Sequence, residues 1–174
     1  RGDIPVLSRA LEAQLEQPIW PVHRLDRETS GVILFAKTAE FHRQANQWFE
    51  KKLIKKAYWA LVHGLPAKPM FRVQQPIEGA RSTTQFEVLE KWAASETAWL
   101  KAVPLTGKRH QIRIHAQSQG HSLLGDTQYG GRTDLISRVA LHAFCLEFPS
   151  GEFFESPMPS DFKAAIEKCK VGNT

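Results

Sequence analysis

The sequence predicts an α+β domain built on a largely antiparallel sheet. Strand-like stretches are interspersed with helical ones without the strict strand–helix–strand alternation of a parallel sheet. A chain of 174 residues is long enough for one ordinary hydrophobic core, and its 42% hydrophobic and 24% charged residues are those of a globular domain. We therefore expect residues 1–174 to form a single domain.

The N-terminal part is expected to hold two helices and a buried strand. Asp3 is suited to cap a first helix with Pro5 in its first turn, and leucines at helical spacing predict a face packed on the core: Leu7, Leu11 and Leu15. The apolar run at residues 32–37 predicts a buried strand. Thr38 is suited to cap a second helix, whose apolar side comprises Phe41, Ala45, Trp48, Phe49 and Leu53.

The middle of the chain alternates between two apolar faces from Lys56 to Val62, which predicts a central strand. Residues 66–69 form a linker, and residues 83–89 and 97–104 are expected to pair as a hairpin across a polar turn at residues 91–96.

The C-terminal part predicts a helix at residues 110–119, closed by Gly120. Arg109 and Arg113 would share one face of this helix, four residues apart. Two strands are then expected, at residues 139–148 and 152–155, joined by a turn at residues 149–151. A closing helix is expected at residues 161–170.

A highly polar stretch precedes the strand expected at residues 32–37. It reads His23-Arg24-Leu25-Asp26-Arg27-Glu28-Thr29-Ser30-Gly31, so it belongs on a loop or strand end, where a scaffold can position reactive groups. Asp26 stands between two arginines that favour its ionised form, and an ionised carboxylate can act as a nucleophile. Alternatively, Asp26 caps a turn with Thr29 and Ser30, and local chemistry leaves both interpretations open.

This stretch, His-Arg-Leu-Asp-x-x-Thr-Ser-Gly, resembles the active-site motif of the RluA-type pseudouridine synthases. Two further segments resemble the same family in the same order: Lys-Ala-Tyr-Trp-Ala-Leu-Val-His-Gly at residues 56–64, and Thr-Gly-Lys-Arg-His-Gln-Ile-Arg-Ile-His at residues 106–115, continuing to Gly125-Asp126-x-x-Tyr129-Gly130. Arg-Val-Ala-Leu-His-Ala at residues 138–143 also fits. The resemblance therefore covers most of the chain.

The resemblance implies a long, bent mixed sheet with flanking helices and a central active-site cleft. It implies an isomerase that converts a uridine in RNA to pseudouridine with no cofactor and no metal. The catalytic residues would be Asp26 as nucleophile, Tyr58 against the target base, and Arg113 in a charge-assisted, bidentate contact with Asp26. The remaining substrate-binding residues would be Arg24 as a wedge for the flipped-out base, His23, Arg109, His110 and Ile112.

Without the resemblance, each of these residues has an ordinary structural interpretation. Arg113 would be a surface arginine, Tyr58 a core aromatic residue, and Arg24 a partner of Glu28. The family also begins with an apolar strand and a Lys-Pro-x-Gly segment, of which Gly2 would be the last remnant. We therefore expect the family's first strand to be missing.

Composition limits the binding partners and the cellular location that we expect for the chain. The net charge of +5 suits a polyanion, and the resemblance implies RNA, either rRNA or tRNA, rather than DNA. Two cysteines are too few for a disulfide framework, and no apolar run is long enough to span a membrane, so a monomer in the cytoplasm is expected. Four histidines lack a metal-ligand spacing: His110, His115, His121 and His142. The sequence also contains no phosphate-binding glycine loop.

Two other functions remain to be weighed. A catalytically inactive RNA-binding module or RNA chaperone would keep the fold and the basic surface. A retaining glycosidase would need two carboxylates facing one bond across about 5 Å, for which only Glu28 lies near Asp26 in sequence. The choice of target RNA would come from the loops at residues 68–81 and 129–138.

Overall fold

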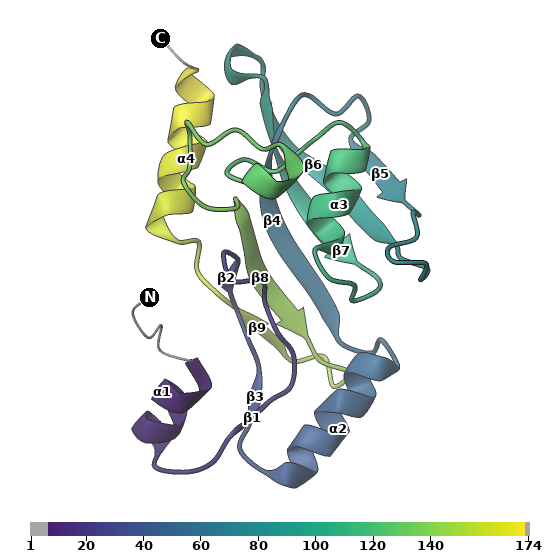
Figure 1. The fold of residues 1–174 in the computed structure, drawn as a ribbon, viewed down its shortest axis with the longest axis vertical. Helices are drawn as coiled ribbons and strands as arrows, with labels where there is room; N and C mark the ends of the chain where they lie inside the picture. Colours follow the sequence, from purple (N-terminus) through teal and green to yellow (C-terminus); the bar gives the residue numbers. More distant parts are fainter. Residues whose placement is uncertain (1–6, 173–174) are drawn as a thin grey trace.

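A seven-stranded mixed sheet forms the centre of the computed structural model, which describes residues 7–172 (Figure 1). Its strands, in spatial order, are β2 (Ser30–Gly31), β8 (Leu141–Glu147), β4 (Lys55–His63), β7 (Thr97–Pro104), β6 (Thr84–Trp92) and β5 (Met70–Val73), with β9 (Phe153–Glu155) paired to β8. Every pair is antiparallel except β2 with β8. The expected largely antiparallel sheet is confirmed.

β4 is the central strand that its two apolar faces predicted. Ala60 and Val62 belong to one hydrophobic cluster, which Ile112 and Ala116 of α3 (Gln111–Ser118) complete. Leu61 belongs to the opposite cluster, which is completed by α4 (Ser160–Val171). The two helices therefore cover opposite faces of the sheet, because successive side chains of a strand point to opposite sides.

The expected hairpin is present, since β6 and β7 pair antiparallel around the short helix η1 (Ala93–Ser95). β5, however, falls within residues 68–81, which the sequence analysis assigned to a target-selecting loop. Its four residues stand between Pro69 and Pro76 and are too short to show an alternating pattern.

α2 (Ala39–Glu50) begins where expected, with the Thr38 side chain accepting a hydrogen bond from the Phe41 N–H at 3.1 Å. The preceding strand is shorter than expected: only β3 (Phe35–Ala36) forms, and it pairs with β1 (Trp20–Pro21).

α1 (Leu7–Leu15) corrects another expectation. None of its residues is buried, and Leu7 and Leu15 are 50% and 41% exposed, so this leucine stripe is not packed in the core. The proposed capping residues Asp3 and Pro5 lie outside the described residues.

The polar stretch at residues 23–31 ends on the sheet edge. Ser30 and Gly31 of β2 pair in parallel with His142 and Ala143 of β8. Gly31 has φ +124°, and a Cβ atom there would lie 2.2 Å from the carbonyl oxygen of Ala143. Only glycine fits this close approach, so the Gly of the motif fixes the end of the stretch against the sheet.

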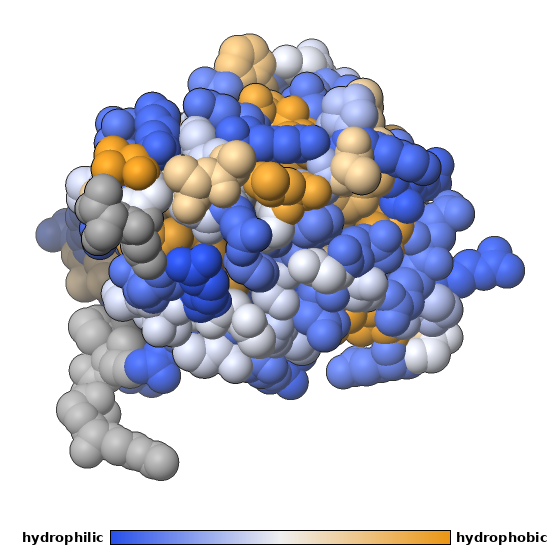
Figure 2. Space-filling view, turned by 90° about the horizontal axis from the view of Figure 1, so that it is seen from above, coloured by the Kyte–Doolittle hydropathy of each residue, from blue (hydrophilic) through white to orange (hydrophobic). Residues whose placement is uncertain are grey.

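The face of the molecule seen in Figure 2 is mostly polar. Seen from above the view of Figure 1, hydrophilic side chains predominate and apolar ones form small separate patches (Figure 2). Between residues 7 and 172, no helix is both long enough and apolar enough to cross a membrane.

Candidate active site

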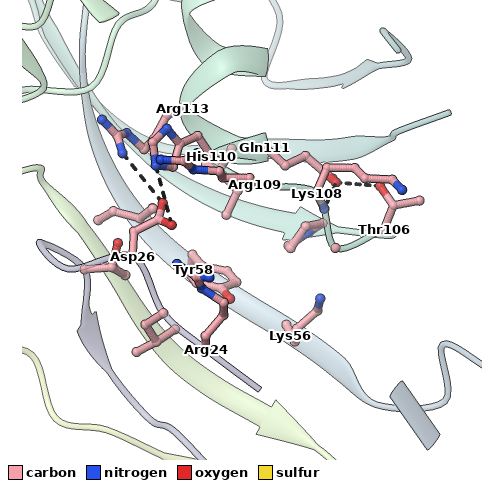
Figure 3. A pocket seen from close by; sticks show the side chains of 16 residues that line it. Arg24, Asp26, Lys56, Tyr58, Thr106, Lys108, Arg109, His110, Gln111 and Arg113 are labelled. Carbon is pink, nitrogen blue, oxygen red and sulfur yellow. Dashed lines mark hydrogen bonds and ion pairs between the residues drawn. The ribbon is translucent and has the colours of Figure 1, made fainter. Parts of the chain in front are cut away.

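A pocket opens between the polar stretch, the middle of β4 and the loop from β7 to α3 (Figure 3). Seven of the eight residues expected at the site line it: Arg24, Asp26, Tyr58, Arg109, His110, Ile112 and Arg113. Three segments that are far apart in the sequence therefore meet at one place.

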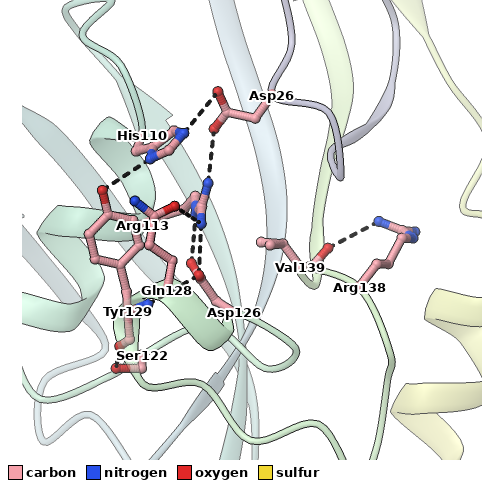
Figure 4. Close-up of polar contacts among 9 residues, drawn as sticks. All are labelled: Asp26, His110, Arg113, Ser122, Asp126, Gln128, Tyr129, Arg138 and Val139. Atoms are coloured by element: carbon pink, nitrogen blue, oxygen red, sulfur yellow. Dashed lines mark hydrogen bonds and ion pairs between the residues drawn. The ribbon is translucent and has the colours of Figure 1, made fainter. Parts of the chain in front are cut away.

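Asp26 lies in a turn in which its backbone carbonyl accepts a hydrogen bond from the Thr29 N–H at 2.9 Å. Its side chain does not cap that turn. One carboxylate oxygen lies 3.7 Å from Nη1 of Arg113 and the other 3.8 Å from Nε2 of His110 (Figure 4). With 23% of its side chain exposed, Asp26 faces the pocket and remains accessible from it.

Asp26 is also the only carboxylate that lines the pocket among residues 7–172. Glu28 is exposed and is not part of the lining. A retaining glycosidase needs a second carboxylate facing the same bond, so the geometry contradicts that alternative.

Arg113 is held from behind by Asp126, a residue to which the sequence analysis assigned no role. Its Nε and Nη2 atoms each donate to a different carboxylate oxygen of Asp126 at 2.7 Å (Figure 4). The Tyr129 ring lies 4.9 Å from the guanidinium carbon. The bidentate contact expected with Asp26 is therefore made with Asp126, and only Nη1 faces Asp26.

Both members of this pair are buried, since Arg113 is 6% exposed and Asp126 is not exposed at all. Burial alone would lower the pKa of Arg113, but the hydrogen bonds and charge of Asp126, aided by the charge of Asp26, outweigh it and raise that pKa. The guanidinium is thus a fixed cation on one wall of the pocket.

His110 precedes α3 in the left-handed backbone region, with φ +54°. The helix starts at Gln111, so Arg109 lies in a turn and does not share a helix face with Arg113 as expected. Nδ1 of His110 lies 3.0 Å from the Tyr129 hydroxyl. Burial lowers the pKa of His110, the nearby Asp26 charge opposes the shift, and Arg113 adds to it.

Tyr58 forms the wall of the pocket beside Asp26 (Figure 3). Burial, followed by the charge of Asp26, raises the pKa of Tyr58 to about 12. The phenol therefore stays protonated near neutral pH and offers a flat ring and a hydroxyl rather than a base.

Basic side chains surround the opening. Arg24 is exposed and forms no ion pair within residues 7–172, so the alternative pairing with Glu28 is absent. Lys56, which was expected only as the first residue of the central strand, also lines the pocket, and burial lowers its pKa. Its position in β4, two residues before Tyr58, was the available signal.

His23 is the expected site residue that does not line the pocket. Its Nε2 accepts a hydrogen bond from the Leu34 N–H at 2.9 Å, and its ring lies 5.1 Å from the Phe49 ring. Burial, followed by the charge of Lys56, lowers the pKa of His23 to about 4. The ring therefore ties the polar stretch to the following segment and to α2.

The other histidines take part in hydrogen bonds with the scaffold. His115 lies within 3.0 Å of the Ser82 hydroxyl and 2.8 Å of the Thr84 hydroxyl, and His142 lies 2.9 Å from the Ser30 hydroxyl. Among residues 7–172, no group of three or more His, Cys, Asp or Glu side chains could hold a metal ion.

Comparisons with known proteins show the family of the chain. Residues 6–118 match the family model described as RNA pseudouridylate synthase. The chain is 35% identical over 167 residues to an uncharacterized RNA pseudouridine synthase of Zymomonas mobilis, covering 82% of this chain and 75% of that protein. It is 36% identical over 174 residues to the ribosomal large subunit pseudouridine synthase C of Vibrio parahaemolyticus, covering 87% of this chain.

The chain spans only 54% of the Vibrio protein, about half its length. The fold matches the solved structure of human RNA pseudouridylate synthase domain containing 1 with a TM-score of 0.78 and 28% identity, covering 94% of this chain and 78% of that one. The chain belongs to the RluA-type family of RNA pseudouridine synthases.

Proposed function

We propose that this chain isomerises a uridine in RNA to pseudouridine and that Asp26 is the reacting carboxylate. The observation that supports this most is the position of Asp26 as the only pocket carboxylate among the described residues, 3.7 Å from a buried arginine cation. The Asp26 carboxylate is accessible from the pocket, and a carboxylate can act as a nucleophile.

The isomerisation breaks the N-glycosidic bond and rejoins the same base to the ribose through a ring carbon. The proton on that carbon is transferred to the base nitrogen, so atoms and electrons balance without an oxidant or a cofactor. Asp26 attacks or stabilises the nucleoside while the bond is broken. The flat Tyr58 ring holds the detached base by stacking. Its pKa of about 12 keeps the phenol protonated near neutral pH, so it does not act as a base.

A uridine within stacked RNA must be flipped out to reach Asp26, which costs a few kcal/mol. Arg24 is placed at the opening with no ion-pair partner among the described residues, and it fills the gap left by the base. Arg109 and Lys56 supply further positive charge at the pocket for the RNA phosphates.

The name of the Vibrio relative supports rRNA as the substrate class, within the wider choice of rRNA or tRNA. As part of the proposal, residues 1–174 act as a single catalytic domain and as a monomer in the cytoplasm. Cys145 and Cys169 are both unpaired, as in a reducing compartment.

The test is to incubate unmodified rRNA with the purified wild-type protein and with Asp26→Asn, and to map pseudouridine. We expect modification at discrete uridines by the wild type and none by the variant. Equal modification by both proteins would rule out Asp26 as the reacting group. Binding of RNA without modification by either would favour the inactive RNA-binding module instead.

A further inference from the structure

A second, larger hollow adjoins the pocket. It encloses about 780 Å³, compared with about 220 Å³ for the pocket, and the two share five lining residues: Lys56, Pro104, Thr106, Gly107 and Lys108. We call the larger hollow the basic groove. It runs between the end of α2, the start of β4 and the loop from β7 to α3.

Positive charge is concentrated in the basic groove. One acidic side chain, Glu50, lines it, together with five basic ones: Lys52, Lys55, Lys56, Arg81 and Lys108. By comparison, the net charge of the whole chain is +5. Only Lys55 is neutralised, by an ion pair with Glu147 at 2.6 Å. Within residues 7–172 the other four form no ion pair, so they are available to an anionic partner.

Part of the lining of the groove is apolar. Val103, Pro104 and Leu105 at the end of β7 line it together with Ile54, and Leu105 is 36% exposed. A groove lined by both cationic and apolar side chains fits a single nucleic-acid strand, because the phosphates can meet the cations and the base faces can meet apolar side chains.

The groove leaves the pocket on the side away from Asp26. Figure 3 shows Lys56 and Lys108 beyond Tyr58, at the opposite end of the pocket from the Asp26 carboxylate. A strand whose target nucleotide is inserted beside Asp26 would pass these two lysines when it leaves the pocket. The neighbouring nucleotides then lie in the groove.

We propose that the basic groove binds the single-stranded RNA segment that directly flanks the target nucleotide, with Lys52 and Arg81 contacting its phosphates beyond the pocket. This inference rests on the proposed function only in that the pocket takes an RNA nucleotide. It assigns a strand path to residues that line the groove and do not line the pocket.

The test compares two double variants that remove the same charge. The groove variant is Lys52→Gln with Arg81→Gln, two exposed side chains outside the pocket. The control is Lys91→Gln with Lys163→Gln, two exposed lysines on β6 and α4 that line neither hollow. None of the four forms an ion pair within residues 7–172, and melting temperatures should confirm that both variants fold.

The probe is a labelled single-stranded oligouridine of about twelve nucleotides, titrated at several salt concentrations. Each phosphate contact of a single strand adds about 0.7 to the slope of log affinity against log salt, so the groove variant should lose about 1.4 from that slope. The control should keep the wild-type slope. An unchanged slope in the groove variant, or equal losses in both variants, would overturn the proposal.

An RNA duplex of the same length gives the second arm of the test. We expect the groove variant to weaken duplex binding less than single-strand binding, and an equal or larger effect on the duplex would overturn the single-strand assignment. Because these titrations measure binding alone, they can fail while pseudouridine formation by the wild type succeeds. They can also succeed if the catalytic proposal fails.

Discussion

Asp26 and Asp126 are two aspartates on opposite sides of one arginine, and the structure treats them differently. Asp126 is fully buried and holds Arg113 through two hydrogen bonds of 2.7 Å. Asp26 is 23% exposed and lies 3.7 Å from the remaining guanidinium nitrogen. Asp126 therefore serves the structure, whereas Asp26 makes only two longer contacts, to Arg113 and His110, and remains accessible from the pocket.

This difference distinguishes Asp126, which positions Arg113, from Asp26, the residue that we propose to react. The side that comprises α3 and the turn at Asp126 is rigid, because its polar groups are paired and buried. The side that carries Asp26 is held by the Thr29 turn and by β2 on the sheet edge. Because Arg113 is fixed from behind by Asp126, its remaining nitrogen faces Asp26 at 3.7 Å without a hydrogen bond.

The largest expected effect separates the two aspartates by stability. Asp126→Asn removes the charged partner of a buried arginine and should lower the free energy of unfolding by about 3–5 kcal/mol. The same substitution at Asp26 should cost no more than about 1 kcal/mol, because that ion pair is longer and partly exposed. Urea unfolding of the two variants checks this, and similar losses would remove the distinction drawn here.

The next largest effect on stability is expected at Gly31, which fixes the polar stretch that carries Asp26 against β8. Gly31→Ala should cost about 2–4 kcal/mol, since it adds a left-handed backbone strain to a clash with the Ala143 carbonyl. Gly79→Ala is the matched control, because Gly79 has φ +74° and nothing lies within 4 Å of an added Cβ. Thermal or urea unfolding should give about 1 kcal/mol for the control, and equal costs would mean that the close approach is unimportant.

His23 should make the Asp26 side sensitive to acid. Its pKa is lowered to about 4 in the folded protein from an ordinary 6.5, so protonation favours the unfolded chain. The stabilising contribution of His23 is complete above about pH 6.5 and is lost as the pH falls toward 4, which amounts to about 2 kcal/mol between pH 7 and 5.

His23→Gln keeps a side-chain acceptor for the Leu34 N–H but does not titrate. Urea unfolding at the two pH values should therefore show a smaller pH dependence for this variant than for the wild type. An identical pH dependence in both proteins would assign the acid sensitivity to other groups.

Tyr58→Phe gives the smallest expected effect. If the ring serves as a stacking wall, Tyr58→Phe should lower the rate of pseudouridine formation less than about tenfold, because the ring is kept. Tyr58→Leu removes the ring and should cost about 1–3 kcal/mol, or about 5–150-fold. Rates measured at saturating RNA check this, and a larger loss in the Phe variant than in the Leu variant would assign the essential role to the hydroxyl.

Much of the fold could be predicted because its signals are local. The two apolar faces of β4, the Thr38 cap of α2 and the left-handed Gly120 after α3 are each readable from a few neighbouring residues. The prediction that the leucines of α1 pack on the core was wrong, because helical spacing indicates an apolar stripe but not which part of the protein covers it.

Most of the residues that line the pocket could be predicted, but the hydrogen-bonded partner of Arg113 could not. Asp26, Tyr58 and Arg113 do meet at one pocket, as the motifs implied. Which aspartate binds Arg113 through two hydrogen bonds depends on how the turn after α3 folds back, and no spacing in the sequence encodes that. His23 was expected at the site because it is the first residue of the motif, but its ring nitrogen accepts a hydrogen bond from the Leu34 N–H.

The central claim is that the Asp26 carboxylate takes part in the reaction while Arg113 only holds its charge in place. The most direct test is the single-turnover rate of pseudouridine formation by Asp26→Asn, at RNA concentrations that saturate both the variant and the wild type. We predict a fall of at least about 10⁴-fold, with RNA affinity and stability close to those of the wild type. A rate within about tenfold of the wild type would contradict the account.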